Sequence, residues 1–495
     1  MELRLSAPQF HVLSYISRVS AASGLNLYLV GGAVRDLTSG HDHVRNMDFA
    51  LEGDVQKILR AIEIDHRKTK TVSGPPRQEP AAKLEQAHFD SRRQSASLNF
   101  APGVQANITM THRETRSRPG RPPEISRAGI FEDLRRRDFS ANAMAVSLHP
   151  NSRGLLLDPT NGAADIEQRE FRALDSHSFL DDPSRIYRLM RLSERLGFKA
   201  AQRTQEWFDA ALEARAWENM SPEMQGRELR ALLQEEHPGR ILRIFGQHGV
   251  LTGLDQSLTA GKIPFDRLEK IRSVARAVPG VDPFLVQFHG IQEKFPPAHR
   301  KRLAHKIMPD AATLRTALSL EADARKLTKA LTASKMNAPS AVYKFLDGTP
   351  QPLLLYVLTH YPQSKIQTRV KNFLFKFPQI RANLPRAEVE ALGVEPGPPT
   401  ENILNQLFLS ILDGKVKTQA QITKALHHWA GLESEPLHKA ALPAAPKKKN
   451  PGIAGNRLRG VSVLPASPTL TRPSARSAVP PDAGRTKERV RGHNS

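Results

Sequence analysis

The segment that most constrains this chain is an apolar run, residues 27–30, which ends in the glycine pair Gly31 and Gly32. The run has the length and composition of a β-strand, and paired glycines allow a sharp turn that brings the backbone close to a ligand. A helix that begins at such a turn offers free N–H groups to an anion. A second apolar strand with Asp48 follows, so the segment predicts an α/β fold with an anion site at its edge.

The acid on this second strand indicates a metal site beside the anion. Asp48 lies where it could hold a metal ion over a triphosphate, but Asn46 occupies the position where a second carboxylate would complete the site. Magnesium prefers carboxylate and phosphate oxygens, whereas asparagine offers a carbonyl oxygen without charge. We therefore expect an atypical site in which Asp48 and Asn46 hold Mg²⁺, or Mn²⁺ in its place.

The composition describes a basic chain of 495 residues without cysteine and with a formal net charge of +22. A positive excess of this size usually reflects a polyanionic partner, most commonly nucleic acid. The absence of cysteine excludes disulfides, thiolate zinc sites and cysteine nucleophiles, and it favours a cytosolic location. Because neither a membrane-spanning run nor a secretory signal is visible, we expect a cytoplasmic protein with no membrane partner.

The pattern along the chain predicts an α+β fold in four parts. Residues 1–150 alternate short apolar runs with turns and form a head with a small mixed sheet. Helical periodicity predicts a neck over residues 151–240 and a body and tail over residues 241–435. Residues 436–495 are rich in Pro, Ser, Ala and Arg, and we expect them to be a disordered basic tail.

Several elements are predicted within this plan. Residues 65–95 are polar and predict a loop or an irregular hairpin. Thr400 and Gly414 bracket a helix over residues 401–413, as a cap and a C-terminal glycine do. The other elements expected in the head are helices over residues 9–22 and 55–64, strands over residues 27–30, 96–100 and 106–111, and apolar runs over residues 139–148 and 155–158.

Five motifs occur in a telling order along the chain. They are Gly31-Gly32-Ala33-Val34-Arg35-Asp36, Asn46-Met47-Asp48, Arg136-Arg137-Asp138-Phe139-Ser140-Ala141-Asn142-Ala143, Leu157-Asp158-Pro159-Thr160-Asn161-Gly162 with Asp165, and Asp181-Asp182-Pro183-Ser184-Arg185 leading to Arg191 and Arg195. Together they resemble the class II tRNA nucleotidyltransferases (CCA-adding enzymes) and bacterial poly(A) polymerases of the DNA polymerase beta-like nucleotidyltransferase superfamily. The resemblance covers about residues 25–430, with specific motifs in the head and general helical character over residues 240–390.

This resemblance implies a template-independent RNA nucleotidyltransferase. In that reaction an RNA 3′-hydroxyl attacks the α-phosphate of ATP or CTP and pyrophosphate leaves; C, A or both are added, and tRNA is the implied RNA. The family's catalytic acids are an Asp-x-Asp pair and an acid on a later strand, which align with Asn46, Asp48 and Asn107. Two further hypotheses stay open: a weak or inactive relative that retains nucleotide and RNA binding, and a basic RNA-binding helical protein whose head is a scaffold.

The resemblance also assigns nucleotide-binding residues. Those around the triphosphate are Gly31, Gly32, Arg35 and Asp36; those at the ribose are Arg137 and Asp138; those that read the base edge are Asp182 and Arg185. Ordinary structural roles compete with these assignments. Arg35 and Asp36 could form a local ion pair, Asp138 could pair with a neighbouring arginine, and Asp182 before a proline could simply cap a helix.

A stripe of four arginines follows the last motif at helical spacing. On a helix, Arg185, Arg188, Arg191 and Arg195 share one arc beside a narrower arc of leucines. We expect Arg185 to point partly inward toward a cleft and the other three to face solvent or a partner. Arg188 and its neighbours could present their charges to nucleotide phosphates or RNA, in a neck that binds both.

Overall fold

The computed structural model describes residues 4–40, 44–71, 82–116, 123–278, 280–308 and 310–432. The basic tail predicted over residues 436–495 therefore lies outside the described residues. The described residues belong to one compact unit, residues 1–434. The domain limits near residues 150 and 240 stay a prediction.

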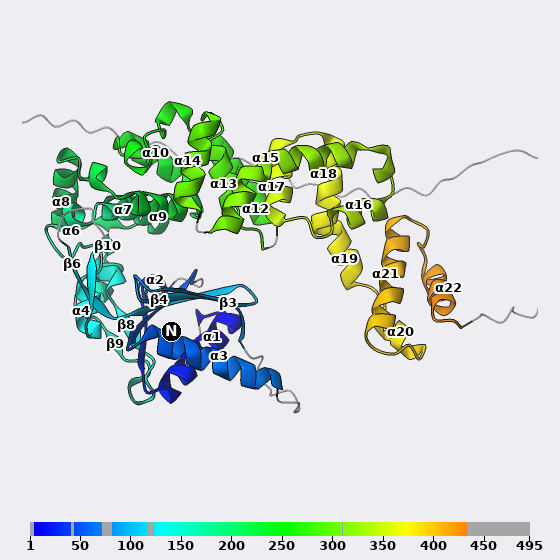
Figure 1. Cartoon of the computed structure of the whole chain (residues 1–495), viewed down its shortest axis with the longest axis horizontal. Coiled ribbons are helices and arrows are strands. Elements are labelled where there is room, and N and C mark those ends of the chain that lie inside the picture. The colour runs from blue at the N-terminus through cyan, green and yellow to red at the C-terminus, as the bar shows by residue number, and fades with distance from the viewer. Residues whose placement is uncertain are drawn as a thin grey trace, which may run out of the picture. The chain divides into compact units, whose positions relative to one another are not determined.

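A mixed seven-stranded sheet forms the centre of the head, in the order β3-β4-β5-β2-β1-β8-β9 (Figure 1). Strands β2 and β5 are parallel, and the other neighbouring pairs are antiparallel. The strands are β1 (Asn26–Val30), β2 (Met47–Glu52), β3 (Lys83–Asp90), β4 (Ser95–Ala101), β5 (Val104–Met110), β8 (Ala145–Ser147) and β9 (Leu156–Leu157). This confirms the α+β class and the three strands predicted over residues 27–30, 96–100 and 106–111.

Two long helices, α1 (Ala7–Ala22) and α3 (Val55–Thr71), pack against one face of this sheet (Figure 1). The first begins where Ser6 and Gln9 form a capping box, in which each side chain accepts a hydrogen bond from the backbone N–H of the other. It confirms the predicted helix over residues 9–22 and starts two residues earlier. The second continues past residue 64, so residues 65–71 are helical rather than part of a loop.

The rest of the polar segment over residues 65–95 divides into two parts. Residues 72–81 lie outside the described residues, and β3 pairs with β4 as an antiparallel hairpin. The pairing shifts register between Leu84 and Gln86, which agrees with the irregular hairpin of the prediction. A second hairpin, β6 (His112–Thr115) with β7 (Glu124–Arg127), lies beside the short helix α4 (Ile130–Arg135).

Helices dominate after β9, as the sequence predicts, with one short parallel pair, β10 (Glu170–Phe171) and β11 (Lys199–Ala200). Helix α2 (Gly32–Thr38) belongs to the head. The later helices are α5 (Gly162–Glu167), α6 (Ser178–Asp181), α7 (Ser184–Leu196), α8 (Gln202–Glu213), α9 (Pro222–Leu233), α10 (Pro238–Gln247), α11 (Leu251–Leu254), α12 (Phe265–Ala277), α13 (Phe284–Ile291), α14 (Pro297–Ile307), α15 (Ala311–Thr332), α16 (Pro339–Leu346), α17 (Gln351–His360), α18 (Ser364–Lys371), α19 (Phe377–Ala382), α20 (Arg386–Ala391), α21 (Pro398–Leu412) and α22 (Gln419–Trp429). Within the described residues, none of these helices is long and apolar enough to cross a membrane.

Helix α21 shows how one predicted boundary was wrong. It begins at Pro398, with Gly397 before it, so Thr400 already lies in its first turn. The Thr400 hydroxyl is buried and donates to the backbone carbonyl of Glu395 instead of capping the helix. Gly414 follows the helix with φ of +70°, which confirms the predicted C-terminal glycine.

Candidate active site

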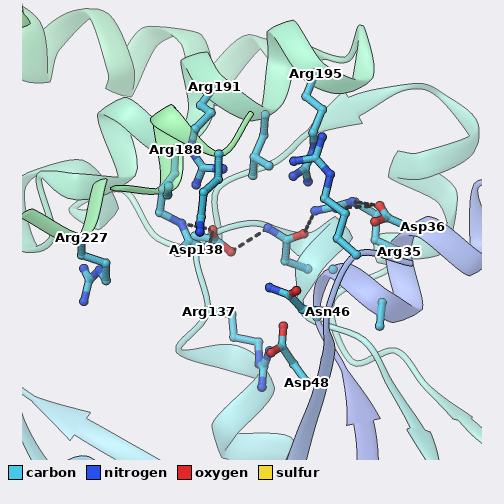
Figure 2. A pocket seen from close by; sticks show the side chains of 18 of the residues that line it. Arg35, Asp36, Asn46, Asp48, Arg137, Asp138, Arg188, Arg191, Arg195 and Arg227 are labelled. Atoms are coloured by element: carbon cyan, nitrogen blue, oxygen red, sulfur yellow. Dashed lines mark hydrogen bonds and ion pairs between the residues drawn. The ribbon is translucent and has the colours of Figure 1, made fainter. Parts of the chain in front are cut away.

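The predicted site residues meet in one pocket of about 890 Å³, formed by the head and by helices α7 and α9 (Figure 2). Nine of its lining residues are arginines and seven are Asp or Glu. Eleven predicted residues line it: Gly31, Gly32, Arg35, Asp36, Asn46, Asp48, Arg137, Asp138, Asp182, Arg185 and Arg188. Asn107, the remaining one, lies beside Asp48. The glycine turn and the acid on the following strand therefore share a single cavity.

The glycine turn brings an arginine close to the backbone. Gly31 has φ of +68°, a conformation that other residues rarely adopt, and it directly precedes helix α2. A Cβ atom at this position would lie 3.1 Å from Nη1 of Arg137. Glycine thus permits both the turn and the approach of a cation to it.

Asp48 is positioned by the parallel pairing of β2 and β5. Its register partner is Asn107, whose Nδ2 donates a hydrogen bond to Asp48 Oδ1 at 2.9 Å. The Asn107 oxygen accepts from the hydroxyl of Ser97 at 3.0 Å. Asn107 therefore lies where the resemblance places it, but in this conformation it supports the Asp48 carboxylate and turns no oxygen toward a metal.

The donors at this point fit one divalent ion. Figure 2 shows Asn46 and Asp48 close together at the pocket wall, and no ion pair joins Asp48 to a cation within the described residues. In that same part of the chain, the one group of three metal-capable His, Asp or Glu side chains lies elsewhere. A single carboxylate with a neutral amide oxygen and substrate phosphates suits one Mg²⁺, which commonly keeps several waters. A second ion would lack its carboxylate.

Nearby acids do not replace the missing charge. Glu52 accepts a hydrogen bond from the backbone N–H of Ile130 at 2.8 Å, at the start of α4. Glu114 lines the pocket, but Arg136 and Arg116 bind its two oxygens at 2.8 and 3.0 Å. Among the residues that the structure describes, the acid placed beside Asn46 without an ion pair is thus Asp48; Asp42 lies outside them.

A chain of hydrogen bonds crosses the pocket from helix α2 to helix α7 (Figure 2). Arg35 is buried and forms an ion pair with Asp36 at 2.6 Å, so the predicted local pair is present. Arg35 Nη1 also donates to the oxygen of Asn142 at 2.5 Å, and Asn142 Nδ2 donates to Asp138 at 3.0 Å. Asp138 then pairs with Arg188 at 2.6 Å, which links helix α2 to helix α7. The linking role of Asn142 was not predicted.

Asp138 is held in its charged form. Burial raises the pKa of its carboxyl, but the guanidinium groups of Arg188 and Arg185 and the amide of Asn142 lower it well below its usual range. The neighbouring Arg137 pairs with Asp133 at 2.8 Å instead. Because Oδ1 of Asp138 also accepts from the backbone N–H of Phe139 at 2.9 Å and its Oδ2 binds Arg188, a ribose hydroxyl would have to replace one of these contacts.

Asp182 stabilises the start of a helix, as the structural alternative predicted, and its place at the base edge stays a prediction. Its Oδ1 accepts from the backbone N–H of Ser184 at 3.2 Å and from the Ser184 hydroxyl at 2.6 Å, which stabilises the start of α7. Its Oδ2 lies 3.1 Å from Arg116 and 4.0 Å from Nε of Arg185. Burial raises the pKa of this carboxyl, but Arg185 and Arg116 lower it below its usual range.

The guanidinium group of Arg185, next to Asp182, also forms hydrogen bonds with other parts of the protein. Arg185 donates to the Ser178 hydroxyl at 2.6 Å and to the backbone carbonyl of Arg136 at 2.8 Å. An incoming base that binds Asp182 and Arg185 would therefore exchange these contacts for its own.

The observed positions of the arginines on α7 differ from the prediction that they face solvent or a partner. Arg191 and Arg195 line the pocket rather than face solvent, because the buried carboxylate of Glu235 holds them at 2.6 and 3.4 Å (Figure 2). Glu235 also binds Arg45, the residue before Asn46, at 2.7 Å. Burial and the charge of Arg35 lower the pKa of Arg195 to about 10. Sequence reasoning missed Glu235, which carries no motif.

Comparisons with known proteins agree with this pocket. The poly A polymerase head domain family matches residues 27–172, which defines the head as a nucleotidyltransferase domain of this class. The A-adding tRNA nucleotidyltransferase of Halalkalibacterium halodurans is 33% identical over 241 residues, which cover 48% of this chain and 52% of that protein. The CC-adding tRNA nucleotidyltransferase of Deinococcus radiodurans is 29% identical over 415 residues, which cover 83% of this chain and 91% of that protein. The chain is thus similar to class II tRNA nucleotidyltransferases, and its head matches the poly A polymerase head domain, in agreement with the resemblance of its motifs.

One further relative and one solved structure show how much of each chain the similarity covers. The A-adding tRNA nucleotidyltransferase of Geobacter sulfurreducens is 24% identical over 430 residues, or 85% of this chain and 47% of that protein. Against the first curated relatives that it matches, the chain spans about half their length or less. A solved CCA-adding enzyme, in apo form II, is 23% identical, covers 86% of this chain and 96% of the solved one, and has a TM-score of 0.47.

Proposed function

We propose that this protein is a template-independent RNA nucleotidyltransferase that adds AMP or CMP from ATP or CTP to an RNA 3′ end, with release of pyrophosphate. The observation that carries the proposal is the placement of Asp48 in one arginine-lined pocket with the Gly31 turn and with Asp182 and Arg185. A scaffold or a general RNA-binding surface has no need of such a pocket. The names of the curated relatives support tRNA as the RNA.

Each group of pocket residues would bind a different part of the nucleotide, according to its position. Arg137, beside the glycine turn, and the arginines of α7 would neutralise phosphate oxygens, while Asp138 would accept hydrogen bonds from the ribose. Asp182 and Arg185 would accept and donate at the base edge. A divalent ion held by Asp48, with Asn46 as a neutral oxygen, would supply charge neutralisation at the triphosphate and lower the pKa of the attacking hydroxyl.

A second candidate is a relative that binds nucleotide and RNA with little or no turnover. Asn46 and Asn107 favour it, because each stands where the family has an acid, and Asn107 directs N–H groups at Asp48. One lost charge-stabilising group at a reacting centre commonly costs about 10²–10³-fold in rate. The two candidates share the pocket and differ in turnover alone.

The test is incorporation of labelled ATP and CTP into a tRNA that lacks its 3′-terminal CCA, in Mg²⁺ and in Mn²⁺. We expect slow addition that rises with metal concentration and is lost in Asp48→Asn. Asp54→Asn is the matched control, because Asp54 is exposed at the start of α3 and loses the same charge. No incorporation with either metal, together with retained nucleotide binding in a titration, would select the second candidate.

A further inference from the structure

A polar cluster lies inside the helical body, apart from the nucleotide pocket. His289 belongs to α13, Glu293 follows the end of that helix, and His360 is the last residue of α17. One nitrogen or carboxylate oxygen from each side chain lies within 4.8 Å of those of the other two. None of the three lines the nucleotide pocket. Neighbouring helices α13 and α17 thus place two imidazoles and a carboxylate at one point (Figure 1).

The ring of His360 is oriented as a ligand ring is. Its Nδ1 lies 3.0 Å from the backbone carbonyl of Tyr356, and its Nε2 lies 3.0 Å from Oε1 of Glu293. The ring also stacks on Tyr356 with 3.9 Å between centroids. When Nδ1 donates to that carbonyl, as the second nitrogen of a metal-ligating histidine commonly does, Nε2 presents a lone pair toward the carboxylate and a metal ion fits between them. In the other tautomer Nδ1 accepts from the Thr359 hydroxyl, 2.9 Å away, and Nε2 donates to Glu293 directly.

The ring of His289 supplies a second, independent observation. This side chain is only 7% exposed, and its Nδ1 has no hydrogen-bond partner within the described residues. Its Nε2 lies 3.4 Å from the hydroxyl of Tyr356 and 3.7 Å from Oε2 of Glu321, on α15. A buried imidazole with an unsatisfied nitrogen is a candidate metal ligand.

The surrounding charges leave room for a divalent ion. Glu293 pairs with Arg267 at 3.1 Å, and Glu321 pairs with Arg300 at 3.4 Å. Arg267 and Arg300 are both partly exposed, so solvent screens their charges. Two carboxylates, those of Glu293 and Glu321, therefore border the two rings.

We propose that His289, Glu293 and His360 bind a single Zn²⁺ ion, with a water molecule at the fourth position. Two imidazoles with a carboxylate oxygen suit this borderline cation, and the chain has no thiolates. Ligand atoms of a tetrahedral zinc ion lie roughly 3.3 Å apart, given bonds of about 2.0–2.2 Å. One ligand atom from each of the three side chains lies within 4.8 Å of the other two, so binding the ion would draw the side chains together. The ion would connect α13 and α17 and stabilise the body.

The test measures zinc in the untagged full-length protein. After chelation, zinc is returned and its stoichiometry is measured by elemental mass spectrometry and calorimetric titration, with Tm recorded at each step. Cobalt replaces zinc in a parallel sample, because tetrahedral Co²⁺ absorbs in the visible range. We expect one zinc per chain, a higher Tm on reloading, and the cobalt band.

Variants assign the ion to this cluster. Glu293→Gln keeps the shape of the side chain, and we expect it to weaken zinc binding by more than about tenfold, as loss of a ligand does. His360→Gln should abolish the cobalt band. Glu390→Gln and His305→Gln, at exposed positions of the same helical region, should change neither. Asp48→Asn should leave the zinc content intact, which separates this site from the nucleotide pocket.

Two results would overturn the proposal. One is a reloaded wild-type protein with no bound zinc and no cobalt band, which would leave His360 hydrogen-bonded to Glu293 without an ion. The other is zinc binding of unchanged affinity in both Glu293→Gln and His360→Gln. Because these measurements need no RNA or nucleotide, they do not depend on the outcome for the proposed function.

Discussion

Asn46 is the residue on which the proposed turnover would depend most directly. It lies at the pocket wall two positions before Asp48. Asn46→Asp restores a charge where a divalent ion and a developing charge on phosphate would meet. We expect a gain of about 10²–10³-fold in kcat, and saturation at lower Mg²⁺, measured by incorporation into tRNA.

The matched control for this substitution is Asn151→Asp, which adds the same charge at an exposed position of the head. We expect no change in kcat from it. Equal rates for Asn46→Asp and the wild-type protein would mean that the metal is held in another way or is not bound at all.

Motif spacing could predict the residues whose neighbours are close in the chain. Gly31, Arg35 and Asp48 lie on one strand–helix–strand unit, and their shared pocket agrees with that local prediction. The direction of Arg191 and Arg195 could not be predicted, because it depends on Glu235, which follows a different helix. Helical periodicity identifies a face of a helix but does not say which buried acid will cover it.

The hairpin β6–β7 is attached to the head by charge. Glu114, on β6, accepts from Arg136 at 2.8 Å and from Arg116 at 3.0 Å, and its Oε1 lies 3.5 Å from the ring of His112. Burial raises the pKa of Glu114, but the hydrogen bond from His112 and the charges of Arg136 and Arg116 lower it to about 2. The folded state therefore binds this proton less readily than the unfolded chain, whose glutamate titrates near 4.5.

This shift predicts a stability that depends on pH. The contribution of Glu114 is present above pH 4.5 and is lost as the pH falls toward 2, and the shift corresponds to roughly 3 kcal/mol. Urea denaturation between pH 6 and pH 3 should show a smaller loss of stability in Glu114→Gln than in the wild-type protein. If stability falls equally with pH in the two proteins, Glu114 does not contribute the predicted pH dependence.

At the scale of helices and strands, elements with strong local sequence signals could be predicted, and elements without them could not. The helix α1 has a capping box and a buried apolar face, and both signals are local. The polar composition of residues 65–71 argued for a loop, but these residues continue helix α3, which the sheet anchors at its start. Tertiary packing overrode a weak local preference there.

Glu235 connects parts of the molecule that are far apart in the chain. This acid is buried and binds Arg45 before β2 as well as Arg191 and Arg195 on α7. Burial raises the pKa of Glu235, and the three guanidinium groups lower it below its usual range. Glu235→Gln should cost about 3–5 kcal/mol of stability, because it leaves buried arginines without their counter-charge.

Urea unfolding measures that loss, and Glu236→Gln is the control. Glu236 is the next residue, is partly exposed and pairs with Arg272 at 2.9 Å. We expect the control to lose less than about 1 kcal/mol, as exposed ion pairs do. Similar losses in the two variants would mean that the buried acid has no special weight.

The buried acids that position the pocket arginines have a kinetic consequence. Asp138 holds Arg188, and Glu235 holds Arg191 and Arg195, through ion pairs within the protein itself. Arginines held in fixed positions attract any compact polyanion. They would therefore bind the pyrophosphate product as well as the substrate and slow its release. Once the bond-forming step is accelerated, exit of the diphosphate by-product becomes the slow event, and the first turnover should outpace those that follow.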